Sequence, residues 1–218
     1  MTRPPHDEGT AHVTAPLTVL AYDGSGIDGS VYTDVVGLAR RSPGWLDSLV
    51  TAWSAYGLAL FAVLMAVAWW RARAQGPRAA VPALAAPLIV VAAFALDDLL
   101  KAVVREDRPC RTLHTVTLEA CPAPGDWSFP SNHATLAAAT AVAVWFVSRR
   151  LGLLTAVAAL AMAASRVWVG VHYPHDVAAG VAVGALTAAV LAVLVRRCSD
   201  AVARRLTATR LRPLLTSS

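Results

Sequence analysis

Residues 177–195 read VAAGVAVGALTAAVLAVLV, an apolar run without a single charged side chain. A helix of about 20 apolar residues crosses the hydrocarbon core of a bilayer. Four further apolar stretches precede it, at 48–70, 81–104, 131–147 and 151–171. Most of the connections between these stretches are short, which favours antiparallel neighbouring helices. The sequence therefore predicts an all-α protein, a polytopic membrane helical bundle of about five transmembrane spans.

The composition indicates a membrane protein rather than a soluble one. Only 15% of the 218 residues are charged and 56% are hydrophobic, whereas soluble domains carry about 25% charged residues. The net charge of +5 does not indicate nucleic-acid binding, because the arginines cluster beside apolar stretches, where they set topology and contact lipid headgroups. Nucleotide-binding glycine motifs and Cys/His metal spacings are absent from the sequence. We therefore expect neither a cofactor nor a metal ion.

The chain divides into three regions. Residues 1–47 form an external N-terminal segment, in which the apolar residues of the 28–41 stretch follow helical spacing. This spacing predicts a short interfacial helix on the membrane surface, and a loop with scattered valines is the alternative. Residues 48–196 form the transmembrane domain, and residues 197–218 form a basic cytoplasmic tail.

The arginines also predict how the chain is oriented in the membrane. One set of connections, together with the C-terminal tail, carries eleven arginines, and the opposite set carries six. Basic loops stay on the cytoplasmic side, so the side with eleven arginines is expected to be cytoplasmic. Arg40 and Arg41 argue against this assignment, because it places them outside. The assignment puts the 105–130 loop and the 172–176 turn on the extracytoplasmic face of the plasma membrane.

Three polar clusters interrupt the apolar background, all at the predicted outer ends of spans. The first is KAVVREDRP at 101–109, where Lys101 and Arg108 are seven residues apart and share one face of a continuing helix. Two cations at a membrane edge suit a phosphate, although an arginine there is also a common interfacial anchor. Lys101 is the single lysine among nineteen basic residues, which favours a role that needs a compact point charge. Asp97 and Asp98 are interpreted as structural partners of Lys101 or of the neighbouring arginine.

The second cluster is SFPSNH at 128–133. Pro130 followed by Ser131 is typical of a helix start, and a helix N-terminus offers free amides and a positive dipole end to an anion. His133 lies in the first turn, where it can give or take a proton. The alternatives are a plain N-cap for Ser131 and an interfacial position for His133.

The third cluster is SRVWVGVHYPHD at 165–176. Arg166 lies inside an apolar span, which makes it a functional-site candidate. His172 closes the span, and Asp176 opens the next helix close enough to hold the imidazole. Pairing with a carboxylate fixes the tautomer of a histidine and raises its nucleophilicity. His175 is interpreted as a loop residue without a catalytic role.

Cations around a phosphate, a nucleophilic histidine and an acidic histidine amount to phosphoryl transfer without a metal. In the order K-x6-R-P, P-S-x-H and S-R-x5-H-x3-D, the clusters resemble the type 2 phosphatidic acid phosphatase (PAP2) superfamily, over roughly residues 95–195. The resemblance implies that His172 is the nucleophile, that Asp176 orients it and that His133 protonates the leaving group. It also implies that five residues bind the phosphate: Lys101, Arg108, Ser131, Asn132 and Arg166. Asn132 stands where many members have glycine, which leaves the size of the substrate open.

Within the superfamily, the plan resembles bacterial undecaprenyl-diphosphate phosphatases of the bacitracin-resistance type. The external N-terminal segment, the five spans and the turn VGVHYPHD at 169–176 carry this likeness. It implies hydrolysis of a polyprenyl diphosphate to the monophosphate, for recycling of a lipid carrier in cell-wall synthesis.

Three other functions compete with this interpretation. A phosphatidic acid or phosphatidylglycerophosphate phosphatase would use the same site. A vanadium haloperoxidase, whose related fold holds vanadate, is disfavoured by the five spans. A non-catalytic lipid transporter or scaffold is disfavoured by the complete set of His133, His172 and Asp176.

Cys110 and Cys121 lie in the 105–130 loop, which is predicted to be outside, where disulfides persist. A bridge between them would close a loop of about ten residues and contribute about 2–3 kcal/mol to stability. Two unpaired thiols are the alternative. Cys198 lies on the predicted inner side and is expected to be free.

Overall fold

The computed structural model describes residues 21–216, which form helices and connecting loops with one isolated β-bridge, between Tyr22 and Glu106, and no strand. The elements in chain order are α1 (Ser25–Ala39), α2 (Gly44–Tyr56), α3 (Leu58–Arg73), α4 (Pro77–Val104), α5 (Pro109–Thr112), α6 (Asn132–Val147), α7 (Arg149–Trp168), α8 (Pro174–Thr207) and the 3₁₀ turn η1 (Arg212–Leu214). The all-α prediction is confirmed. Residues 1–20 of the predicted external segment, and the last two residues of the predicted tail, lie outside the described residues.

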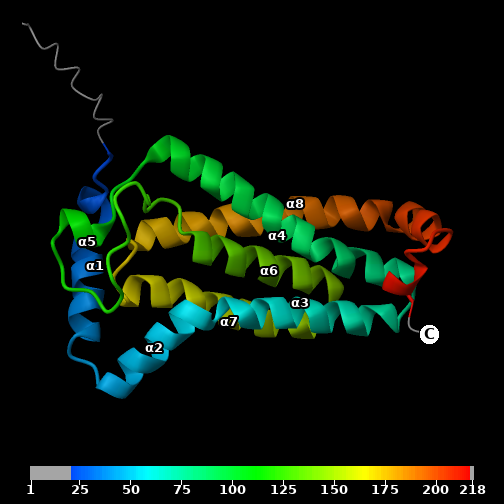
Figure 1. The fold of residues 1–218 in the computed structure, drawn as a ribbon, viewed down its shortest axis with the longest axis horizontal. Helices are drawn as coiled ribbons and strands as arrows, with labels where there is room; N and C mark the ends of the chain where they lie inside the picture. The colour runs from blue at the N-terminus through cyan, green and yellow to red at the C-terminus, as the bar shows by residue number, and fades with distance from the viewer. Residues whose placement is uncertain (1–20, 217–218) are drawn as a thin grey trace, which may run out of the picture.

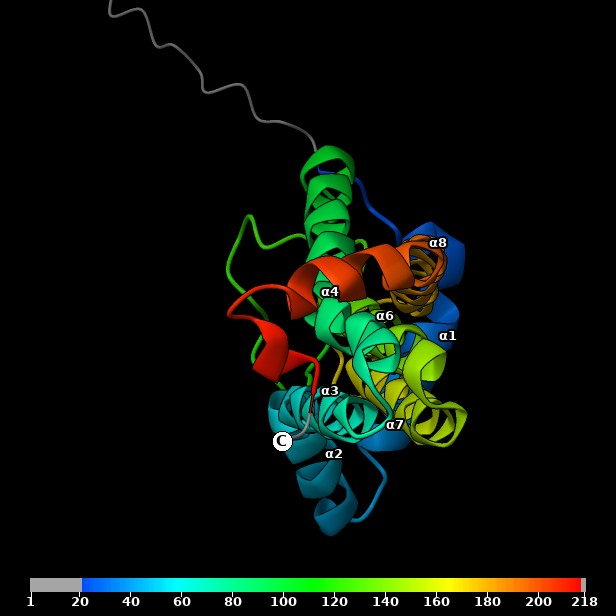
Figure 2. The same ribbon diagram turned by 90° about the vertical axis from the view of Figure 1, so that its right-hand side faces the viewer.

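The long helices form a bundle around α6. Helices α3, α4, α6, α7 and α8 run along one axis, with α1 across one end (Figure 1). Helix α6 lies in the middle and packs against the other four (Figure 2). Most of its buried side chains are alanines, and small side chains let neighbouring backbones approach closely. A Cβ at Gly184 of α8 would collide with the Thr135 carbonyl of α6, so this close contact holds the third polar cluster against the second.

The first apolar stretch forms two helices rather than one. Helices α2 and α3 are bent by 55° relative to each other, so the continuous span predicted at 48–70 must be corrected to a broken one. A Cβ at Gly57, between the two helices, would collide with the Trp53 carbonyl and with the Met162 side chain. Glycine permits this close turn, and one glycine inside an apolar run gives no sequence signal of a break.

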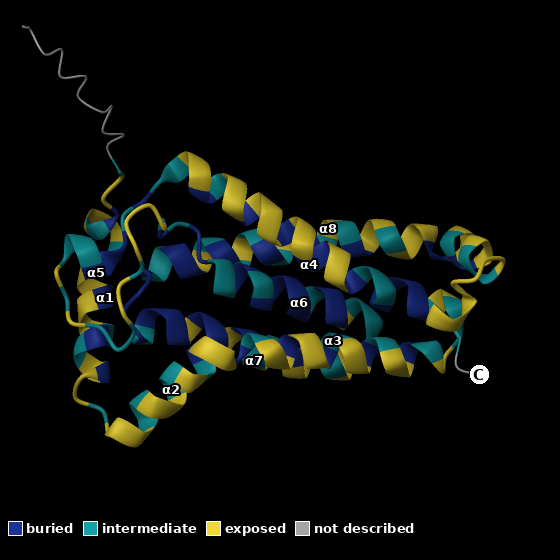
Figure 3. Cartoon of the chain, viewed as in Figure 1, coloured by how far each residue is buried: buried dark blue, intermediate teal, exposed yellow. Residues whose placement is uncertain are grey.

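Judged by helix length and composition, the structure has fewer candidate spans than the sequence predicts. Within residues 21–216, α4, α7 and α8 are each long and apolar enough to cross a membrane, and the bent pair α2–α3 makes a fourth if it counts as one span. Helix α6 is apolar but has 16 residues, so five spans stay a prediction. Helix α8 continues to Thr207, into the region predicted as the tail. Large apolar side chains such as Leu88, Val91 and Leu160 are exposed. Much of the outer surface of the long helices is coloured as exposed (Figure 3), which is the surface expected of helices in lipid.

Helix α1 packs on the end of the bundle that holds the polar clusters. It covers much of the predicted interfacial helix and is interrupted by non-helical backbone at Asp28. Tyr32 is fully buried, and its hydroxyl donates to the Gly170 carbonyl at 2.8 Å. The N-terminal segment therefore rests on the turn that carries His172.

Candidate active site

The structure brings the three polar clusters together at one end of the bundle. The C-terminal end of α4, the N-terminal end of α6 and the turn between α7 and α8 meet there, beside α1 (Figure 1). Arg108 of the first cluster contacts His172 of the third, with 3.2 Å between Nη1 and Nε2. The Ser131 amide of the second donates to the Asp176 carbonyl of the third at 3.1 Å. The predicted residues therefore form one site.

His172 lies at the centre of this site and is 2% exposed. Its Nδ1 atom lies 3.4 Å from both Asp176 Oδ2 and Ser128 Oγ, and its Nε2 atom faces Arg108. Asp176 is itself fixed, because Oδ2 accepts hydrogen bonds from the Ser128 hydroxyl and from the Tyr173 amide. A carboxylate beside Nδ1 favours a proton on that nitrogen, so the lone pair lies on Nε2, which faces Arg108 Nη1.

Burial and neighbouring cations set the charge of His172. Burial first, and then Arg108 and Arg166, hold the pKa of His172 well below its usual value, so the imidazole is neutral near pH 7. Arg108 is held by Asp126, whose backbone and side-chain oxygens accept its Nε and Nη2 hydrogens at 2.9 Å. Burial raises the pKa of Asp126, but the hydrogen bond and charge of Arg108 outweigh it, so that pKa lies below its ordinary value. The ionised pair keeps the guanidinium beside His172.

Lys101 holds the loop that leads into α6. Its ammonium lies 2.9, 3.4 and 2.8 Å from three carbonyl oxygens of this loop, those of Trp127, Ser128 and Pro130. An ammonium has three N–H donors, so all three can be engaged in this arrangement. Lys101 thus has a structural role that the sequence did not indicate, and its contact with a phosphate stays a prediction.

The two aspartates before Lys101 have different environments. Asp97 is fully buried, and its Oδ1 accepts a hydrogen bond from Thr135 Oγ1 of α6 at 2.6 Å. The sequence did not predict this hydroxyl from a neighbouring helix, and the buried hydrogen bond is in keeping with the structural role expected of Asp97. Asp98 is exposed.

The start of α6 presents unpaired polar atoms. Ser131 is fully buried, yet its side chain does not cap the helix. Ser131 Oγ and Asn132 Oδ1 are both buried without a hydrogen-bond partner among the described residues. The plain-cap interpretation of Ser131 is therefore wrong. Buried polar groups at a helix N-terminus suit an anionic ligand, and His133 follows them half-buried in the first turn.

Arg166 enters the site from α7 and is 6% exposed. Its Nη1 donates to the Ser54 hydroxyl of α2 and lies 3.3 Å from Glu119 Oε2 in the 105–130 loop. Its Nε is buried without a partner in the described chain. Glu119 thus supplies an anion where the sequence predicts that Arg166 binds a phosphate.

The 105–130 loop that carries Glu119 is cross-linked. Cys110 and Cys121 form a disulfide, with Cα atoms 6.0 Å apart, whereas Cys198 is free and exposed. Arg111 ties the loop further, through the Pro122 carbonyl.

The sequence indicated that His175 is a loop residue, but it lies in the first turn of α8. Its Nδ1 lies 2.7 Å from Asp28 Oδ1, and its Nε2 lies 2.8 Å from Glu106 Oε1. Glu106, His175 and Asp176 are the group in the described part of the chain whose donor atoms are spaced as in a metal site. Both ring nitrogens of His175 already meet carboxylate oxygens, which is the arrangement of a hydrogen-bond donor rather than of a free metal ligand.

Sequence reasoning missed several residues of this site. Ser128 is the first residue of the SFPSNH cluster, and its hydroxyl beside a histidine motif is the signal that could have identified it as a site residue. Asp126, Glu119 and Ser54 belong to no motif. They reach the site through contacts with Arg108 and Arg166, which only the folded chain reveals.

Known proteins resemble this chain in sequence. The family model described as the PAP2 superfamily matches residues 82–200. Undecaprenyl-diphosphatase BcrC of Bacillus subtilis is 32% identical over 134 residues, which cover 61% of this chain and 66% of that protein. Decaprenylphosphoryl-5-phosphoribose phosphatase of Mycobacterium tuberculosis is 42% identical over 100 residues, 45% of this chain and 53% of that protein. The chain thus spans less than two thirds of the length of either relative.

Solved structures resemble it in fold. LpxE of Aquifex aeolicus superposes with a TM-score of 0.61 at 20% identity, over 80% of this chain and 99% of that one. A PAP2 type phosphatidylglycerolphosphate phosphatase of Bacillus subtilis gives a TM-score of 0.56 at 21% identity, over 80% of this chain and 87% of that one. At these identities the likeness concerns the fold alone.

Proposed function

Because the chain belongs to the PAP2 superfamily, we propose that it is an integral membrane phosphatase that acts on a polyprenyl diphosphate of the undecaprenyl type. It releases phosphate through a phosphohistidine intermediate on His172 and leaves the lipid monophosphate for carrier recycling. One observation carries the chemistry. His172 is buried with Nδ1 beside Asp176 and Nε2 beside Arg108, which is the geometry of an oriented nucleophile next to a phosphate-binding cation.

The reaction proceeds in two displacements. Nε2 of His172 attacks the terminal phosphorus, and the bond from phosphorus to the leaving oxygen breaks as the nitrogen–phosphorus bond forms. Asp176 stabilises the positive charge that develops on the ring, and the cationic side chains stabilise the phosphoryl oxygens. His133 gives a proton to the leaving oxygen, then accepts one from the water that attacks the phosphohistidine. Inorganic phosphate leaves, and His172 is restored.

The names of three relatives support a polyprenyl lipid. Besides the two given above, an undecaprenyl-diphosphatase of Sulfolobus acidocaldarius is 38% identical over 92 residues. A diphosphate also suits this site chemically. Its leaving group, a lipid monophosphate, is already a stable anion, so bond cleavage depends less on proton donation by His133 than it does for an alkyl ester.

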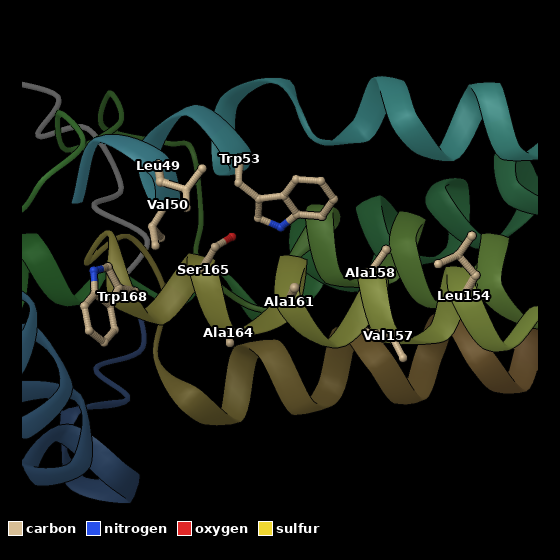
Figure 4. Close-up of a pocket in the computed structure, with 10 residues that line it drawn as sticks. All are labelled: Leu49, Val50, Trp53, Leu154, Val157, Ala158, Ala161, Ala164, Ser165 and Trp168. Atoms are coloured by element: carbon tan, nitrogen blue, oxygen red, sulfur yellow. The ribbon is translucent and has the colours of Figure 1, made fainter. Parts of the chain in front are cut away.

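An apolar groove beside the site supports a lipid substrate. It has a volume of about 470 Å³ and lies between α2 and α7, where the side chains that line it are apolar apart from Ser165 (Figure 4). Ser165 precedes Arg166, and Trp53 precedes Ser54, the hydroxyl partner of Arg166. The groove is therefore lined by the same segments of α2 and α7 that carry Ser54 and Arg166. We assign the groove to the part of the substrate's hydrocarbon tail next to the phosphate.

Phosphate release by the purified protein tests this function. The panel contains undecaprenyl diphosphate, phosphatidic acid, phosphatidylglycerophosphate and a polyprenyl phosphoribose monophosphate, and His172→Ala is the control for contaminating phosphatase. We expect the fastest release from the prenyl diphosphate and none with H172A. A strong preference for another lipid would refute the proposed substrate, and turnover by H172A would refute the phosphohistidine.

Filling the groove tests its assignment. Ala161→Trp puts a bulky side chain into the groove, and Leu186→Trp puts one on α8, at a position that is 68% exposed outside it. We expect A161W to raise KM for the long-chain lipid but not for a short soluble phosphate ester, and L186W to change neither. Equal KM values for A161W and wild type on the lipid would show that the tail lies elsewhere.

The side of action needs its own test. The arginine distribution supports an active site on the extracytoplasmic face. A reporter that is active only outside the cytoplasm should then be active when it is inserted in the 105–130 loop. A reporter that is active only in the cytoplasm should be active when it is fused to the C-terminus. The reverse pattern would contradict this orientation.

A further inference from the structure

His175 lies among carboxylates from three parts of the chain. From α1, Asp28 accepts hydrogen bonds from the His175 amide and from Nδ1, both at 2.7 Å. From the segment after α4, Glu106 Oε1 lies 2.8 Å from Nε2. From α8 itself, Asp176 Oδ1 lies 3.5 Å from Nε2. One ring therefore connects the N-terminal helix and the first polar cluster to the carboxylate behind His172.

These contacts determine the charge of the ring. An ionised carboxylate only accepts hydrogen bonds, and a neutral imidazole has a single N–H. With Asp28 and Glu106 ionised, both ring nitrogens meet an acceptor, so only the imidazolium, with N–H on both nitrogens, can donate to both. His175 is thus a cation set among three acidic groups, of which Glu106 and Asp176 are almost fully buried.

The position of the ring is fixed by more than its polar contacts. It stacks on Tyr173, with 5.3 Å between ring centroids and 16° between planes. A Cβ at Gly24 would collide with Glu106 Oε1, so the chain before α1 packs directly on the glutamate. Tyr22 also pairs with the backbone on both sides of Glu106. Such a ring has little freedom to leave the carboxylates.

Asp176 is where this arrangement meets the chemistry. Its Oδ2 is engaged by Ser128 and Tyr173, but its Oδ1 is buried and has no hydrogen-bond partner within residues 21–216. A buried charge without compensation is costly, and the imidazolium of His175 supplies the opposite charge on that side. We infer that His175 is a positioning residue: its fixed positive charge keeps Asp176 ionised and in place to orient His172. The inference rests on the proposed phosphoryl transfer.

Two substitutions separate charge from shape. His175→Gln removes the cation and keeps one side-chain donor. His175→Arg keeps a planar cation with several donors. Losing a charged hydrogen-bonding partner at a buried site should lower kcat of H175Q about ten- to a hundredfold. Its KM should not change, because the phosphate-binding residues are untouched, and H175R should retain most of kcat.

Asp28→Asn separates the catalytic effect from the attachment of α1. D28N weakens the contact of His175 with α1 but leaves the cation beside Asp176. We expect D28N and H175Q to lower the melting temperature by similar amounts, but D28N should lower kcat far less than H175Q does. Equal kcat losses for H175Q and H175R, or a loss in H175Q that follows only the folded fraction, would overturn the inference.

A measurement without turnover keeps the two proposals distinguishable. In 15N-histidine-labelled protein at pH 7, one resonance pair should show protons on both ring nitrogens and disappear in H175Q. A neutral His175 would overturn the inference whatever the activity. An inactive wild type with a charged His175 would instead count against the proposed function, and it would leave the charge of His175 established.

Discussion

Replacing Asp176 by asparagine gives the sharpest test of the site. Asp176→Asn keeps the shape of the side chain but removes the negative charge that lies 3.4 Å from His172 Nδ1. Two unit charges at this separation interact by about 5 kcal/mol at an effective dielectric constant of 20. The charge on the ring develops only as the phosphohistidine forms, so this energy is lost mainly from the transition state. At 1.36 kcal/mol per tenfold, kcat should fall about 10³- to 10⁴-fold.

The assay is single-turnover formation of the phosphoenzyme, measured beside KM and melting temperature. KM should stay near the wild-type value, because Arg108 and Arg166 are unchanged. Ser128→Ala is the matched control. It removes one hydrogen bond to the same carboxylate oxygen but leaves the charge, at a cost of about 1 kcal/mol or roughly fivefold. A D176N rate within tenfold of wild type, or a larger loss in S128A than in D176N, would refute the assigned role.

Four further predictions concern proton transfer, pH, metal and the loop. His133→Ala should slow hydrolysis of a monophosphate ester far more than that of a diphosphate, and equal losses in stopped-flow phosphate release would contradict its role as the acid. The pKa of His172 is lowered on folding, so below the ordinary histidine pKa of about 6.5 the unfolded chain binds more protons than the folded one. Stability should therefore fall as pH drops through that value, and His172→Gln should flatten this dependence of the melting temperature on pH. Chelators should leave turnover unchanged and vanadate should inhibit it, whereas loss in chelator with recovery in a divalent ion would point to a metal. Reducing the Cys110–Cys121 disulfide should lower the melting temperature, because the cross-link contributes about 2–3 kcal/mol by restricting the unfolded chain, and an unchanged melting curve would show that the cross-link does not contribute.

The sequence was most informative where function restricts residue type over short spacings. The motifs around Arg108, Ser131 and His172 each lie at a helix end, and helix ends can be located from apolar periodicity and turn residues. Their convergence at one end of the bundle followed from antiparallel helices. That much of the site required no structure.

The sequence was uninformative where a residue acts through a distant partner. His175 looked like an ordinary turn residue, because its partner Asp28 lies 147 positions away. Lys101 looked like a phosphate ligand, and nothing in the local pattern showed that three carbonyls of a later loop surround it. The break at Gly57 was hidden for another reason. Both helices are apolar, so hydropathy is continuous through a bend that backbone packing determines.

The length of α6 has a consequence for how substrates are selected. Its 16 residues extend about 24 Å at 1.5 Å per residue, less than the roughly 30 Å of a bilayer core. We therefore expect the N-terminus of α6, the proposed phosphate site, to lie below the level that the longer helices around it can reach. A phosphate that arrives from water must shed its hydration to descend that far. A phosphate attached to an isoprenoid tail is held at the membrane by its own anchor, so we expect soluble phosphate esters to be poorer substrates than lipid phosphates.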